Sequence, residues 1–245
     1  MTLQVTGVTA RYGSVAALTD VTLRAEPGVT ALLGVNGAGK STLLSVCAGI
    51  LSPASGHVQV SGHQLGVRKE RRAALRAVAL MPQVASFPPT LTAHDVVSYL
   101  GWLKGMSGRA ASAAAADRLA DVGLGPVMHN RCGSLSGGMQ RRLALAQALV
   151  STPEVVLLDE PSTGLDPEQR RGMVELIRGL SSTVVLSSHV VEDVEDLANR
   201  VVVLDGGRVV FDGTTAELTA GLPGNGRRSR VEAGFFRAIG REARA

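Results

Sequence analysis

Short apolar runs alternate with helical stretches along most of the chain. Apolar and polar residues alternate over residues 3–8 and 20–25, which predicts strands with one exposed face. Residues 29–35 and Val155–Asp159 are almost wholly apolar, a pattern typical of strands that are buried on both faces. A helix is predicted over residues 40–48. These elements together predict an α/β fold.

The pattern becomes helical over residues 84–150. Thr92 and Asp95 have the spacing of a capping box, and apolar residues then follow at helical intervals. An alanine-rich stretch over residues 109–122 and a third stretch over residues 137–150 are also typical of helices. We therefore expect an inserted α-helical subdomain here.

Strands return after this insertion. Asp166 and Pro167 are typical of an N-cap and a first helical residue, so a helix is predicted to begin there. A buried strand is predicted over residues 182–188, and a hairpin with a Gly-Gly turn over residues 201–213. We divide the chain into a domain over residues 1–222 and a basic tail over residues 223–245.

Composition and charge limit the class of protein. The 245 residues are 45% hydrophobic, which is enough for one buried core. The tail from residue 226 contains six arginines and two glutamates, so it accounts for the formal net charge of +4. Such a tail can contact anionic lipid or nucleic acid, but we expect it to be solvated.

Two further features concern the cellular setting. The two cysteines are far apart, without metal-ligand spacing, so a disulfide is not expected and a reducing compartment is favoured. No secretory signal is visible, and no apolar run approaches the roughly 18 residues of a membrane span. We expect a soluble protein that needs another protein to act across a membrane.

The segment "GVNGAGKS", residues 34–41, matches the phosphate-binding loop G-x-x-x-x-G-K-[ST]. It follows an apolar strand and opens a helix, whose free N–H groups and positive end attract an anion. Lys40 would contact the β- and γ-phosphates, and the Ser41 hydroxyl would bind Mg²⁺. The residues expected to surround the nucleotide phosphates are Gly34, Val35, Asn36, Gly37, Ala38, Gly39, Lys40, Ser41 and Thr42.

Two carboxylates follow the buried strand "VVLLD". Asp159 ends the strand, where a Mg²⁺ ion beside the phosphates would neutralise its charge. Glu160 is then in a position to act as general base on an attacking water, an effect typically worth about 10²–10⁴-fold in rate. Asp-Glu at a strand end is otherwise a common surface loop, and the upstream phosphate loop favours the catalytic interpretation.

Ser136, Gly137 and Gly138 precede the third predicted helix of the insertion. Each glycine inside a helix costs about 1 kcal/mol relative to alanine. One interpretation is a second anion-binding helix terminus without a lysine, and the other is a helix cap with a flexible lead-in. The spacing of the residues leaves both open.

The ordered motifs "GVNGAGKS", "MPQ", "SLSGGMQRR", "VVLLDEPSTGLDP" and "SSH" resemble those of ABC-type ATPases. The resemblance extends from Tyr12 to the hairpin near Phe211. It implies a P-loop NTPase (RecA-like) core with an N-terminal antiparallel β-subdomain and an inserted α-helical signature subdomain. In that family two ATPase domains face each other head to tail, and Ser136, Gly137 and Gly138 of one contact the ATP that the other holds.

The resemblance also implies roles for four further residues. Tyr12 would stack on adenine, and Gln83 would reach Mg²⁺ and the attacking water. His189 would contact the γ-phosphate, and Asp166 would lie in the loop that crosses the dimer interface. Met139 stands where the family more often has glutamine.

The function that this resemblance implies is ATP binding and hydrolysis in a transporter. The family's cofactors are ATP and Mg²⁺, and its partners are integral-membrane transporter subunits and a second ATPase subunit, here a second copy. The motifs look most like the exporter branch, with residues 86–105 as the coupling surface and residues 231–245 containing a short helix. We expect a peripheral location at the cytoplasmic face of the cell membrane, and no nucleic-acid partner.

Two alternatives belong to other functional classes. A non-transport ABC ATPase would act on nucleic acid or ribosomes, but such proteins carry two ATPase domains or a long coiled coil in the insertion. A P-loop kinase or GTPase would leave the Ser-Gly-Gly helix unexplained, and the N-K-x-D motif of guanine recognition is absent.

Overall fold

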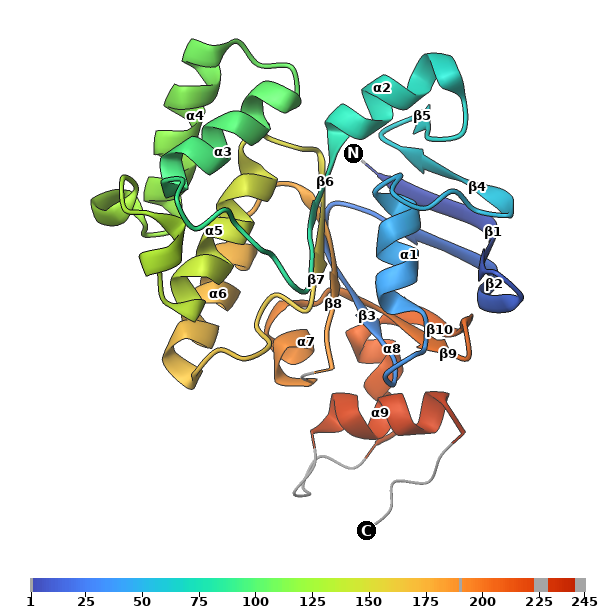
Figure 1. Ribbon diagram of the computed structural model, residues 1–245. Coiled ribbons are helices and arrows are strands. Elements are labelled where there is room, and N and C mark those ends of the chain that lie inside the picture. Colours follow the sequence, from blue (N-terminus) through green and yellow to red (C-terminus); the bar gives the residue numbers. More distant parts are fainter. Residues whose placement is uncertain (1, 190, 223–228, 241–245) are drawn as a thin grey trace.

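The computed structural model describes residues 2–189, 191–222 and 229–240, whose strands form two β-sheets (Figure 1). The first sheet has the order β2-β1-β4-β5 and the second the order β10-β9-β3-β8-β7-β6. The strands are β1 (Leu3–Tyr12), β2 (Val15–Ala25), β3 (Gly28–Leu33), β4 (Ser55–Val60), β5 (His63–Gln64), β6 (Val78–Met81), β7 (Val155–Asp159), β8 (Thr183–Ser187), β9 (Arg200–Asp205) and β10 (Arg208–Thr214).

Helices flank both sheets and form a separate group beside them (Figure 1). The helices are α1 (Lys40–Cys47), α2 (Arg68–Ala77), α3 (Ala93–Leu103), α4 (Gly108–Asp121), α5 (Gly137–Leu149), α6 (Pro167–Arg178), α7 (Val191–Leu197), α8 (Thr215–Thr219) and α9 (Arg230–Ala238). Among the described residues, no helix combines the length and the apolar character needed to cross a bilayer.

The six-stranded sheet positions the site. Every residue of β7 and β8 is buried, which agrees with the apolar runs of the sequence. The strands β3, β6, β7, β8 and β9 pair in parallel. Parallel strands have their carboxyl ends at one edge. The segments after β3, β7 and β8 therefore meet at that edge, although they are far apart in the sequence.

The N-terminal sheet is antiparallel and has its own apolar contacts with the core. The strands β1 and β2 are longer than the predicted alternating segments, and their pairing shifts register between Val5 and Arg11. Side chains such as Leu3, Leu18 and Val58 form one cluster with Leu43 and Leu157 from the core. The antiparallel β-subdomain is thus confirmed.

The insertion is helical, as predicted. Thr92 and Asp95 form a complete capping box at the start of α3, and Ser107 caps α4. The small face of α4, with Ala111, Ala115 and Leu119, is buried.

Local predictions at the ends of several elements are also confirmed. Asp166 caps α6 by accepting hydrogen bonds from the backbone N–H groups of Glu168 and Gln169, the second and third residues of the helix. Gly206 and Gly207 turn the β9–β10 hairpin with positive φ values of 52° and 76°. Cys47 and Cys132 are free and buried.

Among the described strands and α-helices, β5, α2 and α8 were not predicted. Helix α2 has the sequence "RKERRAALRA" and buries only Ala74 and Ala77, so it lacks the apolar periodicity that marks a helix. Residues 223–228 and 241–245 of the predicted tail lie outside the described residues, and the division of the chain at residue 222 stays a prediction.

Substitution of Leu157 by alanine tests the core of the six-stranded sheet. Leu157 is 0% exposed on β7, so we expect the free energy of unfolding to fall by about 2–5 kcal/mol. Leu103→Ala is the matched control, because Leu103 is 56% exposed. Urea denaturation measures both, and an equal loss of stability in the two variants would contradict this assignment of the core.

Candidate functional site

A cleft of about 480 Å³ lies at the carboxyl edge of the parallel strands. It brings together most of the predicted phosphate-binding residues and all four predicted catalytic residues, Lys40, Gln83, Glu160 and His189, which are far apart in the sequence. The residues that line it are Ala17, Asn36, Gly37, Ala38, Gly39, Lys40, Ser41, Thr42, Gln83, Glu160, Thr163 and His189.

The loop between β3 and α1 needs its glycines for two different reasons. Gly39 has a φ of 103°, and a side chain there would lie 2.8 Å from the Ala17 carbonyl oxygen. Gly34 lies so close to the neighbouring strand that a Cβ atom would be 2.6 Å from the Leu204 carbonyl oxygen. The loop is therefore packed tightly from behind, and its residues 36–39 line the cleft on the other side.

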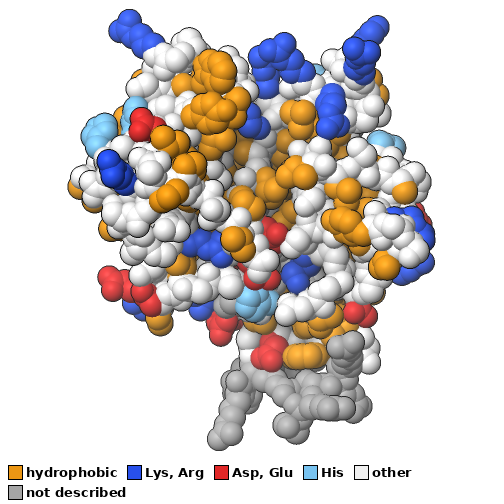
Figure 2. Space-filling view, in the orientation of Figure 1, with side chains coloured by type: hydrophobic (Ala, Val, Ile, Leu, Met, Phe, Trp, Pro, Cys, Tyr) orange, Lys and Arg blue, Asp and Glu red, His pale blue; other side chains and the backbone are white. Residues whose placement is uncertain are grey.

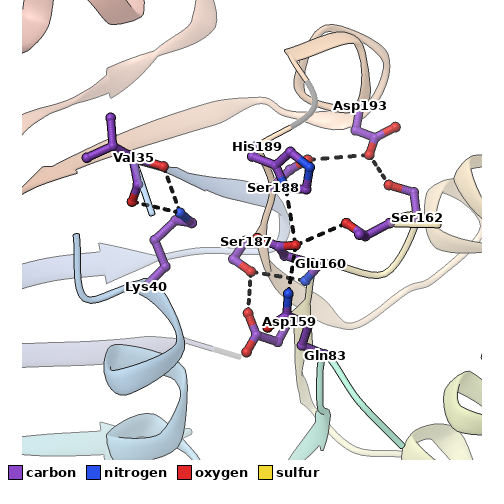
Figure 3. A network of polar contacts seen from close by, with 12 residues as sticks. Val35, Lys40, Gln83, Asp159, Glu160, Ser162, Ser187, Ser188, His189 and Asp193 are labelled. Carbon is purple, nitrogen blue, oxygen red and sulfur yellow. Dashed lines mark hydrogen bonds and ion pairs between the residues drawn. The ribbon is translucent and has the colours of Figure 1, made fainter. Parts of the chain in front are cut away.

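Lys40 is 6% exposed at the start of α1. Its Nζ donates hydrogen bonds to the carbonyl oxygens of Gly34 at 2.7 Å and Val35 at 3.3 Å (Figure 3). Burial lowers the pKa of Lys40, while the negative charges of Glu160 and Asp159 act in the opposite direction. The ammonium thus lies in the field of two carboxylates, Glu160 in the cleft and Asp159 beside it.

The side chain of Glu160 is contacted by residues from three other positions in the chain, Gln83, Thr163 and His189 (Figure 3 labels Gln83 and His189). Its Oε2 accepts hydrogen bonds from Gln83 Nε2 at 3.0 Å and Thr163 Oγ1 at 3.0 Å. His189 Nδ1 lies 3.1 Å from the same oxygen. The Glu160 side chain is 9% exposed, and the backbone has a φ of 49°, which is strained for a residue other than glycine.

Asp159 and Glu160 share Ser187 as a partner. Ser187 Oγ donates to Asp159 Oδ1 at 2.6 Å and accepts from the Glu160 N–H at 3.0 Å. The two strands are in register here, with Asp159 opposite Ser187. The sequence analysis did not identify Ser187, and the only signal for it is the pairing of two parallel strands.

The oxygen donors at this edge fit a hard divalent cation. The hydroxyl of Ser41, the amide of Gln83 and the carboxylate of Asp159 are the donor types that Mg²⁺ prefers alongside substrate phosphates. Within the described ranges, no group of three or more His, Cys, Asp and Glu side chains is arranged to hold a metal by itself. A nucleotide would have to complete the coordination.

Eight predicted site residues are not among those that line this cleft, and three of them, Gly34, Val35 and Asp159, contact or adjoin residues that do. Tyr12 ends β1 and is 56% exposed. Asp166 is the N-cap of α6. Ser136 caps α5 and accepts a hydrogen bond from the Met139 N–H, and the remaining two are Gly137 and Gly138.

The two glycines at the start of α5 differ in their surroundings. A Cβ atom at Gly138 would lie 1.9 Å from Gln169 Oε1 of α6, so this glycine makes room for a side chain of the same chain. A Cβ atom at Gly137 would meet nothing within 4 Å. The backbone at Gly137 is accordingly open to an approaching group.

Arg141 links the helical insertion to the cleft, a role that the sequence analysis missed. From α5 its Nη1 donates to the Gln83 carbonyl oxygen at 2.5 Å, and its Nη2 donates to the Thr163 carbonyl oxygen at 3.4 Å. Burial lowers the pKa of Arg141, and Glu160 and Asp159 act in the opposite direction. Gln83 and Thr163 each donate a side-chain hydrogen bond to Glu160, and the guanidinium of Arg141 binds the backbone carbonyl of both.

The family model described as ABC transporter matches residues 18–163, which contain the phosphate loop, Gln83, the Ser-Gly-Gly helix and Glu160. The chain belongs to the ABC transporter family. This membership excludes the alternative of a P-loop kinase or GTPase, and it confirms the resemblance read from the motifs.

Similar proteins of known name are also ATP-binding proteins of resistance or export systems. The chain is 34% identical over 227 residues to the linearmycin resistance ATP-binding protein LnrL of Bacillus subtilis, covering 91% of this chain and 72% of that protein. It is 35% identical over 240 residues to the daunorubicin/doxorubicin resistance ATP-binding protein DrrA of Streptomyces peucetius, with 96% and 72% covered. For the Nod factor export ATP-binding protein I of Rhizobium etli the identity is 35% over 221 residues, with 89% and 69% covered.

Solved structures confirm the fold class. An ATP-binding subunit of an ABC transporter superposes with a TM-score of 0.84 at 24% identity, covering 98% of this chain and 100% of that one. The ATP-binding cassette MJ0796, as a post-hydrolysis dimer bound to ADP and Pi, gives 0.76 at 26% identity, covering 86% and 98%. The chain is therefore an ABC transporter ATP-binding subunit and an ATPase.

Substitution of Arg141 by alanine tests the link between the insertion and the cleft. We expect faster amide hydrogen exchange at residues 82–86 and at the start of α5, because two charge-assisted hydrogen bonds are lost. Each is worth about 1.5–3 kcal/mol, so the exchange rate should rise by about tenfold or more. Arg109→Ala on the exposed start of α4 is the control, and equal exchange in the two variants would contradict the link.

Proposed function

We propose that this ATPase hydrolyses ATP at Glu160, in a head-to-tail dimer of two copies, and that the cycle powers export through separate membrane-spanning subunits. The observation that carries the proposal is the convergence of Gln83, Thr163 and His189 on one oxygen of Glu160 beside the phosphate loop. That oxygen faces a cleft of the size needed for nucleotide phosphates.

The proposed chemistry is a single in-line displacement. The loop N–H groups and Lys40 bind the β- and γ-phosphates. The Glu160 carboxylate takes a proton from water while the water oxygen bonds to the γ-phosphorus, and the bond from that phosphorus to the bridging oxygen breaks to release ADP. His189 and Gln83 orient the water, and a bound Mg²⁺, held by Ser41, Gln83 and Asp159, would neutralise phosphate charge.

The proposed dimer rests on the residues that lie outside the cleft. The N-terminus of α5 offers free N–H groups, and the open backbone at Gly137 allows a γ-phosphate held by a second copy to approach closely. Asp166 would lie at the same interface, and exposed Tyr12 would stack on the adenine ring. The dimeric form of the MJ0796 cassette, which this chain resembles, supports the arrangement.

Export is supported by the names of the relatives, which concern drug resistance and Nod factor export. The same names favour transport over the alternative of a non-transport ABC ATPase that acts on nucleic acid or ribosomes. We accordingly propose a peripheral position at the cytoplasmic face of the cell membrane.

A groove of about 710 Å³ between α2 and α3 is the proposed docking site of the membrane subunits. Its floor is apolar, with Leu75, Leu80 and Leu100, and Figure 2 shows hydrophobic side chains gathered between the two upper lobes with Lys and Arg above them. Five cationic residues line it, namely Arg68, Arg71, Arg72, Arg76 and Lys104. These features fit a partner helix with an apolar face and an acidic edge.

Lys104 also joins the two walls of this groove. Its Nζ donates hydrogen bonds to the carbonyl oxygens of Leu75 and Val78, each at 2.8 Å. Burial lowers the pKa of Lys104. The end of α3 is therefore held against the end of α2, and part of the predicted coupling surface, residues 100–105, forms one wall.

Substitution of Glu160 by glutamine tests the proposed base. The amide keeps the size of the side chain but cannot accept the proton, so we expect ATP hydrolysis to fall by about 10²–10⁴-fold with ATP binding retained. The variant should then elute as an ATP-dependent dimer on size-exclusion chromatography.

Two further variants serve as controls in the Glu160→Gln background. Lys40→Ala should abolish ATP binding in a titration, and Ser136→Arg should leave binding intact but prevent the dimer. Hydrolysis by Glu160→Gln within a few-fold of wild type would show that Glu160 is not the base. A dimer that persists with Ser136→Arg would contradict the head-to-tail arrangement.

Reversal of charge at the exposed groove residue Arg72 tests the docking site. We expect Arg72→Glu to lower the fraction of the tagged full chain that sediments with membranes from its native cells by about tenfold, since a like charge now faces the proposed acidic edge. ATP hydrolysis by the purified variant should not change. Arg109→Glu, outside the groove, is the matched control, and an unaltered membrane fraction for Arg72→Glu would refute the docking site.

A further inference from the structure

A buried carboxylate lies behind the cleft and has no part in the chemistry described above. Asp193, on α7, is 2% exposed. It accepts hydrogen bonds from the hydroxyl of Ser162, from Arg170 Nε at 2.6 Å and from Ser188 Oγ at 3.4 Å (Figure 3 shows the two serines). A charge this deeply buried is retained only where its partners compensate for lost hydration.

The three donors come from three separate segments of the site. Ser162 lies two residues after Glu160, and Ser188 directly precedes His189. Arg170 lies on α6, four residues after the N-cap Asp166. Asp193 therefore joins the turn that carries Glu160, the loop that carries His189 and the helix that begins at Asp166.

Asp193 is the main carboxylate partner of the Arg170 guanidinium. Its other carboxylate neighbour, Glu192, lies 3.8 Å from Nη2 with a side chain that is 65% exposed, a geometry that contributes little. The pair with Asp193 is shorter and its carboxylate is 2% exposed. Loss of the Asp193 charge would weaken the hydrogen bonds that this carboxylate accepts from Arg170 and from both serine hydroxyls.

We propose that Asp193 is a positioning residue for ATP hydrolysis, which fixes the turn of Glu160 against the loop of His189 and connects both to α6. The proposal rests on the role proposed above for Glu160 and His189. On this proposal, Asp193 maintains the contact between His189 Nδ1 and Glu160 Oε2, which are 3.1 Å apart. The histidine side chain is 48% exposed, so other packing holds it only in part.

The effect of Asp193 should appear in turnover and not in nucleotide affinity. Lys40 is held by carbonyl groups of its own loop, so the phosphate-binding residues do not depend on α7. In contrast, a shift of Ser188 moves the adjacent His189 directly. A misplacement of reacting groups by about 1 Å can cost on the order of 10²-fold in rate.

The test compares Asp193→Asn with Asp196→Asn, the same substitution at an exposed position of the same helix. We expect Asp193→Asn to lower kcat by about 10–100-fold, per mole of protein that binds ATP, while the Kd for ATP stays within about threefold. Asp196→Asn should match wild type. Asp193→Glu, which keeps the charge, should recover part of kcat.

Ser162→Ala provides a second variant that removes only one hydroxyl from the network. It should lower kcat by several-fold without changing the Kd for ATP. The double variant Ser162→Ala/Asp193→Asn should be no slower than Asp193→Asn alone, because both changes break the same connection. This measurement keeps the proposal testable if Asp193→Asn folds poorly.

Two outcomes would overturn the proposal while leaving the proposed base intact. One is a kcat for Asp193→Asn within about threefold of wild type when Glu160→Gln abolishes hydrolysis. The other is normal kcat for Ser162→Ala with only the melting temperature lowered, which is the result of a purely structural contact. If Glu160→Gln itself still hydrolyses ATP, the proposed function fails first.

Discussion

The parallel pairing of β7 with β8 is the constraint on which the site depends. It places Asp159 opposite Ser187, and the serine hydroxyl then connects the Asp159 carboxylate and the Glu160 backbone N–H to the neighbouring strand. The chain reverses into the next segment at Glu160 with a positive φ, so the two adjacent acidic side chains take different directions. One points to the sheet edge and the other to the loops from the insertion and from β8.

Around the cleft, opposite charges come from different segments of the chain. Lys40 on α1 and Arg141 on α5 both lie in the field of Asp159 and Glu160, which opposes the effect of their burial on their pKa values. Behind the cleft, Arg170 and Asp193 form a second pair between α6 and α7. Because each cation and its anion come from different elements, the charges stabilise the arrangement of the elements around the cleft.

Most of the elements and site residues that the sequence predicted correctly were indicated by local patterns of neighbouring residues. The phosphate loop, the Thr92 capping box and the Asp166 cap are each specified by a few neighbouring residues, and the resemblance to one family ordered the motifs. Ser187, Asp193 and Arg141 escaped prediction, because their roles arise from strand register and from contacts between distant elements. Helix α2 was missed for a different reason, since its buried face consists of alanines.

The helical insertion is attached to the core by two cations at opposite ends. Lys104 holds the end of α3 to α2 and β6, and Arg141 holds the start of α5 to the segments of Gln83 and Thr163. Both ends of the insertion thus hold carbonyl groups outside it, and the bonds from α5 join it to the two segments whose side chains donate hydrogen bonds to Glu160.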